Sequence, residues 1–232
     1  MLLALLAIAG GCTVPVNWFG RKPPPPKTTP WENDTQAGAE AYKEGNLDEA
    51  ERRLELARER AASGSGDQLA IAASLSNLSV VHRAQGDIPG AIELQKEALE
   101  IREKAQGPEH PDVAVTLNSL AALYAAQDDY ASAESALKRA LAIREKALGA
   151  DNHYTAESLN NLALLYAAQG RYSDAEPLYQ RALVIFEQHK DPRELATALE
   201  NYAALLEETG RTAAAEEMDT RARAVRATDV RK

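Results

Sequence analysis

Apolar residues recur at helical spacing on two consecutive segments between residues 159 and 188. The first segment carries Leu159, Leu162, Leu165 and Tyr166, and the second carries Ala175, Leu178, Tyr179, Ala182, Leu183 and Phe186. Residues three and four apart share one face of an α-helix, so each segment is predicted to be an amphipathic helix. Gly170 lies between them, and glycine suits the left-handed conformation that ends many helices. The pattern therefore predicts a helical hairpin.

Signals for the ends of helices accompany this pattern. Ser173 and Glu176 have the spacing of a capping box, in which both side chains accept backbone N–H groups at the start of a helix. Asp112 is predicted to be the N-cap of an earlier helix. Arg144 falls near the end of another predicted helix, where a cation complements the helix dipole.

The hairpin pattern is repeated along the chain. Equivalent residues are spaced by 42 in four sets: Leu75, Leu117 and Leu159; Gly86, Asp128 and Gly170; Ala91, Ala133 and Ala175; and Leu99, Leu141 and Leu183. A copy with a spacing of 40 follows at Leu199, Gly210 and Ala215, and a copy 41 residues upstream contains Gly45 and Ala50. A single hairpin cannot cover its own apolar face, so the copies are expected to stack as a solenoid that shares one core.

The small and large residues of these hairpins resemble the tetratricopeptide repeat signature, most clearly at Leu162, Ala163, Tyr166, Gly170, Tyr172, Ala175, Tyr179 and Ala182. The connector at 107–112 lengthens the period, and this 42-residue form is similar to the repeats of kinesin light chains and their bacterial relatives. The resemblance covers residues 33–228 and implies an all-α tetratricopeptide-repeat α-solenoid of about five helical hairpins.

The repeats are expected at about 33–66, 67–108, 109–150, 151–190 and 191–228, within a repeat domain at 33–232. The helices are expected at 33–44, 47–61, 68–85, 89–105, 112–127, 130–147, 154–169 and 172–188, with a last pair that ends near Arg226.

The chain starts with an uncharged apolar run at residues 1–11, next to its only cysteine. A membrane-spanning helix needs about 20 apolar residues, so this run is too short to cross a bilayer. Ala9-Gly10-Gly11-Cys12 resembles the lipobox of bacterial lipoproteins, which implies a signal peptide at 1–11 and lipidation of Cys12. Residues 12–32 are rich in proline, which predicts an extended tether between the lipid and the repeats.

Thr13 follows the cysteine, and by the sorting pattern of such lipoproteins it implies an outer-membrane protein that faces the periplasm. The alternative is a free cysteine in a cytoplasmic protein that has no lipid anchor.

The net charge of −9 argues against a nucleic-acid partner, because phosphates require a face rich in lysine and arginine. The sequence contains no Gly-rich phosphate loop, no HExxH motif and no pair of cysteines, and its four histidines lie at unrelated repeat positions. We therefore expect no catalytic residues, no metal site, no cofactor and no small-molecule substrate. The chain is expected not to be an enzyme.

A row of amides is the one polar feature without an evident structural role. In the resembled family the first helix of each hairpin lines a concave groove, and the positions that face it hold Asn77, Asn118, Asn160, Asn161 and Asn201. In similar repeats, asparagines at these positions bind the backbone of an extended peptide, because an amide both donates and accepts hydrogen bonds. Alternatively, these asparagines only bridge neighbouring helices.

One turn further along, the groove is expected to present Val80, Ala122, Leu164 and Ala204, with Arg83 at one end and Glu207 and Glu208 at the other. The function predicted from this arrangement is a non-enzymatic scaffold, a lipid-anchored periplasmic adaptor that binds a peptide or helix of an envelope assembly partner. The alternatives are a structural repeat protein that self-associates and a cytoplasmic adaptor, and the oligomeric state stays open.

Overall fold

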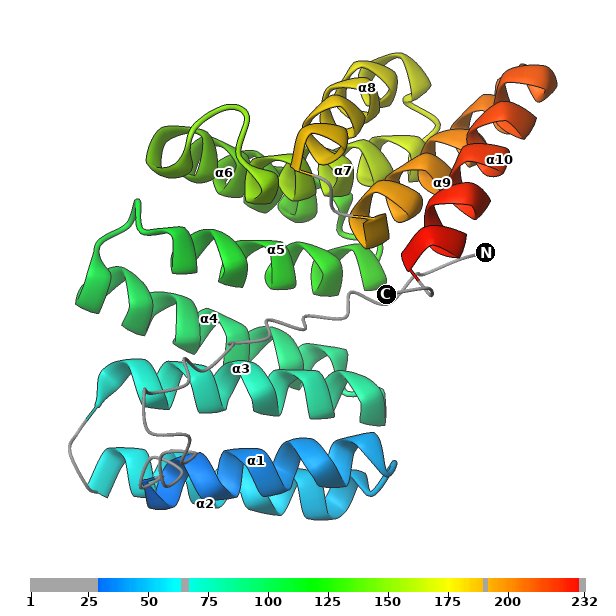
Figure 1. The fold of residues 1–232 in the computed structure, drawn as a ribbon. Helices are drawn as coiled ribbons and strands as arrows, with labels where there is room; N and C mark the ends of the chain where they lie inside the picture. Colours follow the sequence, from blue (N-terminus) through cyan, green and yellow to red (C-terminus); the bar gives the residue numbers. More distant parts are fainter. Residues whose placement is uncertain (1–28, 64–66, 190–191, 230–232) are drawn as a thin grey trace, which may run out of the picture.

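The computed structural model describes residues 29–63, 67–189 and 192–229, so the predicted signal peptide, Cys12 and most of the predicted tether lie outside the described residues. All regular structure in these ranges is α-helical (Figure 1). The helices are α1 (Pro30–Lys43), α2 (Leu47–Ser63), α3 (Gln68–Gln85), α4 (Ile88–Gln106), α5 (Pro111–Ala126), α6 (Tyr130–Leu148), α7 (His153–Ala168), α8 (Tyr172–His189), α9 (Pro192–Glu208) and α10 (Thr212–Asp229). They form hairpins one to five in chain order, which confirms the predicted all-α solenoid.

The first helix begins earlier than predicted. Thr29 and Glu32 form a capping box: the backbone N–H of Thr29 donates to the Glu32 carboxylate at 2.6 Å, and the Thr29 hydroxyl accepts from the backbone N–H of Glu32 at 3.4 Å. Pro30 occupies the first helical position, where its missing N–H has no cost. Helical structure therefore starts inside the segment that was expected to be tether.

Two of the predicted caps are wrong. α8 already begins at Tyr172, so Ser173 lies inside its first turn, and the Glu176 carboxylate accepts from the Tyr202 hydroxyl at 2.8 Å instead of capping its own helix. α5 begins at Pro111, and the residue before it is the N-cap: His110 Nδ1 accepts from the backbone N–H of Asp112 at 3.2 Å. A proline favours the first helical position, so the cap falls on the residue that precedes it.

Each hairpin buries an apolar face against the next one. Ala41, Ala50 and Leu54 of hairpin one form a buried cluster with Leu78 and Val81 of α3. The same kind of cluster joins the next two hairpins, with Ala91 and Ile92 of α4 packed against Leu120 and Leu123 of α5. Hairpins three to five share one larger cluster. The core therefore runs along the stack, as the repeat spacing predicted.

The two helices of a hairpin lie on different sides of the stack. First helices contact one another directly, α1 with α3, α5 with α7, and α7 with α9. In the described ranges, the backbones of consecutive second helices do not come this close to one another. Three of the four consecutive pairs of first helices approach in this way, all except α3 with α5, so the first helices form the inner side of the stack and the second helices form the outer side. We call the exposed surface of α1, α3, α5, α7 and α9 the inner surface.

Gly170 tests the hairpin turn. Its φ is +71°, and a Cβ added there would meet no atom within 4 Å, so replacement has a conformational cost only. We expect Gly170→Ala to lower the free energy of unfolding by about 1–2 kcal/mol, measured by urea denaturation.

The matched control is Gly38→Ala, inside α1, whose Cβ would lie 2.7 Å from Leu54 Cγ. This variant should lose stability through packing against α2, so its loss should fall when Leu54 is also shortened to valine. The loss in Gly170→Ala should be independent of Leu54, and a dependence would contradict a purely local cost.

Candidate interaction surface

The predicted amides lie on successive first helices: Asn77 on α3, Asn118 on α5, Asn160 and Asn161 on α7, and Asn201 on α9. The structure brings one pair into direct contact. Asn201 Nδ2 donates to Asn160 Oδ1 at 3.3 Å, and Asn160 is only 7% exposed. This pair bridges two neighbouring helices, which is the alternative role considered for the row.

Two of the other amides remain available to a ligand. Asn77 and Asn161 are partly exposed and make no side-chain hydrogen bond to any described residue. Asn118 is partly exposed as well, but its Oδ1 atom is buried and has no partner among the described residues. Sequence reasoning missed Gln36, which occupies the position of Asn77 in hairpin one and donates to Glu40 at 3.1 Å. The spacing of 41 to the upstream copy would have identified it.

Exposed apolar side chains follow the same helices. Val80 is 37% exposed and Leu164 is 38% exposed, one turn beyond Asn77 and Asn161 respectively. Val115 on α5 is 37% exposed and was not predicted, although it holds the repeat position of Ala73. Five of the six large apolar side chains that are exposed in the described ranges lie on first helices, namely Leu69, Val80, Val115, Tyr154 and Leu164. Exposed apolar side chains are therefore concentrated on first helices.

At two positions near the C-termini of the first helices, charge is found only in hairpins one, two and five. The position near the C-terminus of each first helix holds Lys43, Ala84, Ala126, Ala168 and Glu208 in hairpins one to five. The neighbouring position holds Arg83 in hairpin two and Glu207 in hairpin five. Arg83 is partly exposed and has no ion pair with a described residue. The middle of the inner surface is therefore uncharged at these positions, between a basic end and an acidic end.

The outer side is charged and internally paired. Arg139 of α6 lies 2.5 Å from the Glu103 carboxylate of α4, and Arg181 of α8 lies 2.6 Å from Glu145 of α6. Arg221 of α10 pairs with Glu187 of α8 at the equivalent position. Long side chains thus span the wider separation of the second helices. Each pair is partly exposed and contributes little stability by itself.

The sequence analysis gave Arg144 only a role in complementing the helix dipole, but the structure shows that it also joins two helices. Its side chain is buried, and Nη1 donates to the Tyr154 carbonyl at 2.5 Å, the Glu157 carboxylate at 3.1 Å and the Ser158 hydroxyl at 3.1 Å. Burial lowers the pKa of the guanidinium. Arg102 has the equivalent role one hairpin earlier, where it donates to Thr116. These arginines attach a second helix to the following first helix.

Glu134 of α6 is a second junction between hairpins. Its carboxylate accepts hydrogen bonds from Lys138 on the same helix, from Arg171 in the turn of hairpin four, and from the Tyr166 hydroxyl of α7. The Lys138 hydrogen bond makes the largest contribution, and together these contacts lower the pKa of Glu134 to about 2. Glu176 repeats the arrangement with Arg211, whose hydrogen bond lowers the pKa of Glu176.

None of the helices in the described ranges is both long and apolar enough to cross a membrane. Among the same residues, no cluster of three or more histidine, cysteine, aspartate or glutamate side chains is arranged to hold a metal ion.

Known solved structures share this architecture. BtubC (BKLC) from P. vanneervenii is 26% identical, with a TM-score of 0.76 over 85% of this chain and 80% of that chain. A chain from Podosopora anserina described as a kinesin light chain with nearly identical TPR-like repeats is 23% identical, with a TM-score of 0.69 over 86% of this chain and 96% of that chain. A Rap protein complexed with Competence and Sporulation Factor is 17% identical, with a TM-score of 0.68 over 84% of this chain and 54% of that chain.

No curated protein matches the chain significantly.

Stacked helical hairpins define the class as an α-solenoid. The tetratricopeptide repeat model matches residues 34–104, 71–146, 112–188 and 154–228, so the chain belongs to the tetratricopeptide repeat family. The predicted likeness to kinesin light chains is confirmed by the solved structures. The fold is that of a protein–protein interaction scaffold.

Glu134 predicts a contribution to acid sensitivity. Its pKa is lowered from 4.5 to about 2 in the folded state. The stabilisation is therefore fully present above about pH 4.5 and is lost as the pH falls toward 2. The free energy of unfolding, measured by urea denaturation, should therefore decrease less on going from neutral to acidic pH in Glu134→Gln than in the unchanged chain. Glu93→Gln is the control, because Glu93 pairs only with Lys96 on an exposed surface. An equal acid response in the unchanged chain and Glu134→Gln would contradict the prediction.

Proposed function

We propose that the chain is a non-enzymatic adaptor that binds a segment of a partner protein on its inner surface. The observation that carries this proposal is the concentration of exposed apolar side chains on first helices, represented by Val80 and Leu164. Apolar side chains left exposed in one region of a soluble surface commonly mark a contact with another molecule. The paired charges of the outer side supply no comparable region.

The residues suit an extended segment or a helix with a largely uncharged centre. Asn77 and Asn161 offer an amide donor and an amide acceptor to a ligand backbone, since no described residue uses either side chain. Val80 and Leu164 provide apolar contacts, while Ala84, Ala126 and Ala168 leave room beside them. Lys43 and Arg83 at one end and Glu207 and Glu208 at the other favour acidic and basic ligand residues respectively.

We further propose that the adaptor is anchored by a lipid on Cys12 to the outer membrane and faces the periplasm. Support comes from the lipobox-like residues 9–12, the apolar run before them and the proline-rich residues that follow. Under this proposal residues 1–11 are removed as a signal peptide and residues 12–29 hold the solenoid away from the lipid. The partner is then another protein of the cell envelope.

A charge placed on the inner surface tests the binding site. Val80→Lys combined with Leu164→Lys adds two cations at exposed positions of α3 and α7, and it should reduce capture of partner proteins from an envelope extract at least about tenfold, because desolvating each unpaired charge is costly. Circular dichroism confirms that both chains are folded.

The matched control is Ala142→Lys combined with Val184→Lys, which adds the same charge at equivalent exposed positions of α6 and α8 on the outer side. This control should capture partners as the unchanged chain does. If the control loses its partners and the inner variant keeps them, the binding surface is the outer side.

The lipid anchor has its own test. Expressed in a Gram-negative host with labelled palmitate, the chain should incorporate label and fractionate with the outer membrane. Cys12→Ala should abolish the label. An unlabelled chain that fractionates identically with and without the substitution would contradict the anchor and favour the cytoplasmic alternative, while leaving the inner-surface proposal intact.

A further inference from the structure

Hairpin one lacks the residues with which the other hairpins dock. In hairpins two to five, two positions on the first helix face the preceding hairpin, and all are buried: Leu78 and Val81, Leu120 and Leu123, Leu162 and Leu165, Tyr202 and Leu205. The equivalent residues of α1, by the spacing of 41, are Ala37 and Glu40, and Glu40 is exposed. The surface of hairpin one that corresponds to a docking face is therefore small and charged.

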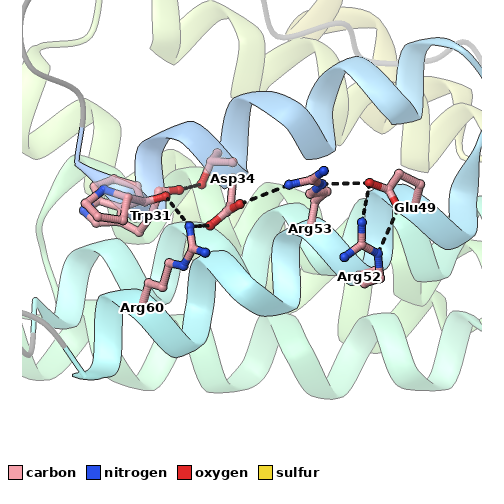
Figure 2. Close-up of polar contacts among 8 residues, drawn as sticks. Trp31, Asp34, Glu49, Arg52, Arg53 and Arg60 are labelled. Carbon is pink, nitrogen blue, oxygen red and sulfur yellow. Dashed lines mark hydrogen bonds and ion pairs between the residues drawn. The ribbon is translucent and has the colours of Figure 1, made fainter.

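Beneath that surface, a cluster of charged side chains, the ion cluster, stands where hairpin two has apolar core residues. Asp34 stands where the other first helices have Leu75, Leu117, Leu159 and Leu199, and it is only 4% exposed. Arg60 Nη1 lies 2.5 Å from one Asp34 oxygen and Arg53 Nη1 lies 3.6 Å from the other (Figure 2). These arginines of α2 replace Leu94 and Ile101 of α4. In hairpin two the corresponding contact of Leu75 with Leu94 and Ile101 is apolar.

The arginines complete their own pairing within hairpin one. Arg53 Nε donates to the Glu49 carboxylate at 2.7 Å, and Figure 2 shows Asp34, Arg53 and Glu49 in one line of contacts along α1 and α2. The side chains of Arg53 and Arg60 are 37% and 47% exposed. Water therefore still reaches both guanidinium groups, although the carboxylate between them is buried.

Trp31 is a third departure at the same end. The equivalent residues of hairpins two to five are Ala72, Ala114, Ala156 and Ala196, and all four are 0% exposed. Trp31 is partly exposed, beside the ion cluster on α1. Trp31 therefore places a large side chain at a position where each of the other hairpins has a fully buried alanine.

We propose that hairpin one is an end cap, which closes this end of the stack against pairing with a second copy of the chain. A helix packed onto this end would remove water from Arg53, Arg60 and Glu40, and the loss of hydration of charged groups is unfavourable unless new partners compensate it. The ion cluster holds α1 to α2 without exposing the apolar face that hairpin two has. This inference does not depend on the inner-surface function.

The test gives hairpin one the residues of hairpin two. The variant combines Asp34→Leu, Ala37→Leu, Glu40→Val, Arg53→Leu and Arg60→Ile. Sedimentation should show a constant mass for the unchanged chain across a concentration series and a twofold rise in mass for the variant. A dimer is expected rather than a fibre, because α10 at the far end exposes Glu216, Glu217, Arg221 and Arg223 and offers no complementary apolar face.

The control removes the same number of charges of each sign from the outer side, by Glu103→Leu, Arg139→Leu, Glu145→Leu and Arg181→Leu, and should keep its mass. A second variant, Ala37→Leu with Glu40→Val, leaves the ion cluster unchanged and should dimerise more weakly than the first. The proposal is overturned if the unchanged chain dimerises through α1, if the control associates as strongly as the variants, or if both folded variants stay monomeric.

Hydrogen exchange supplies a measurement that needs no association. Asp34→Asn weakens two charge-assisted contacts, so amide exchange in residues 30–63 should accelerate at least about tenfold, while residues 111–168 stay unchanged. Unchanged exchange in residues 30–63 would show that the cluster does not hold α1 to α2, which would overturn its role in the cap.

Discussion

The burial of one hairpin's apolar face against the next is the interaction on which the rest of this structure depends. A two-helix unit cannot cover that face by itself, so Leu78 and Val81 are buried against Ala41, Ala50 and Leu54 of hairpin one. The same constraint requires a different solution in hairpin one, which has no preceding helical hairpin in the described residues. In hairpin one, the charged residues Asp34, Arg53 and Arg60 occupy positions that are apolar in hairpin two. Stacking and capping are therefore two consequences of one requirement.

Stacking also separates the molecule into two sides with different chemistry. The first helices approach closely, and the inner side is lined by alanines, amides and a few exposed valines and leucines. The second helices are farther apart, and pairs such as Arg181 with Glu145 span the distance between them. Charges that are paired across the outer side make it a less suitable surface for an apolar ligand than the part of the inner side near Ala84, Ala126 and Ala168, which is uncharged at these positions.

The candidate site shares residues with the structure that supports it. Asn160 and Asn201 bridge α7 and α9, whereas Asn161, the residue next to Asn160, leaves its amide unused within the described chain. Adjacent residues on a helix point about 100° apart, so one lies between helices while the other faces outward. This geometry allows a single pair of asparagines to contribute both to helix packing and to an interaction surface.

The sequence by itself determined the hairpins, their order and their number, because the spacing of Leu75, Leu117 and Leu159 and the turn residues are local or periodic signals. The resemblance to tetratricopeptide repeats implied which helices face inward. Only the tertiary structure decided which polar side chains meet. Glu176 pairs with residues 26 and 35 positions away, and Asn160 with one 41 positions away. Such contacts depend on the distance between packed helices, and helical periodicity contains no information about that distance.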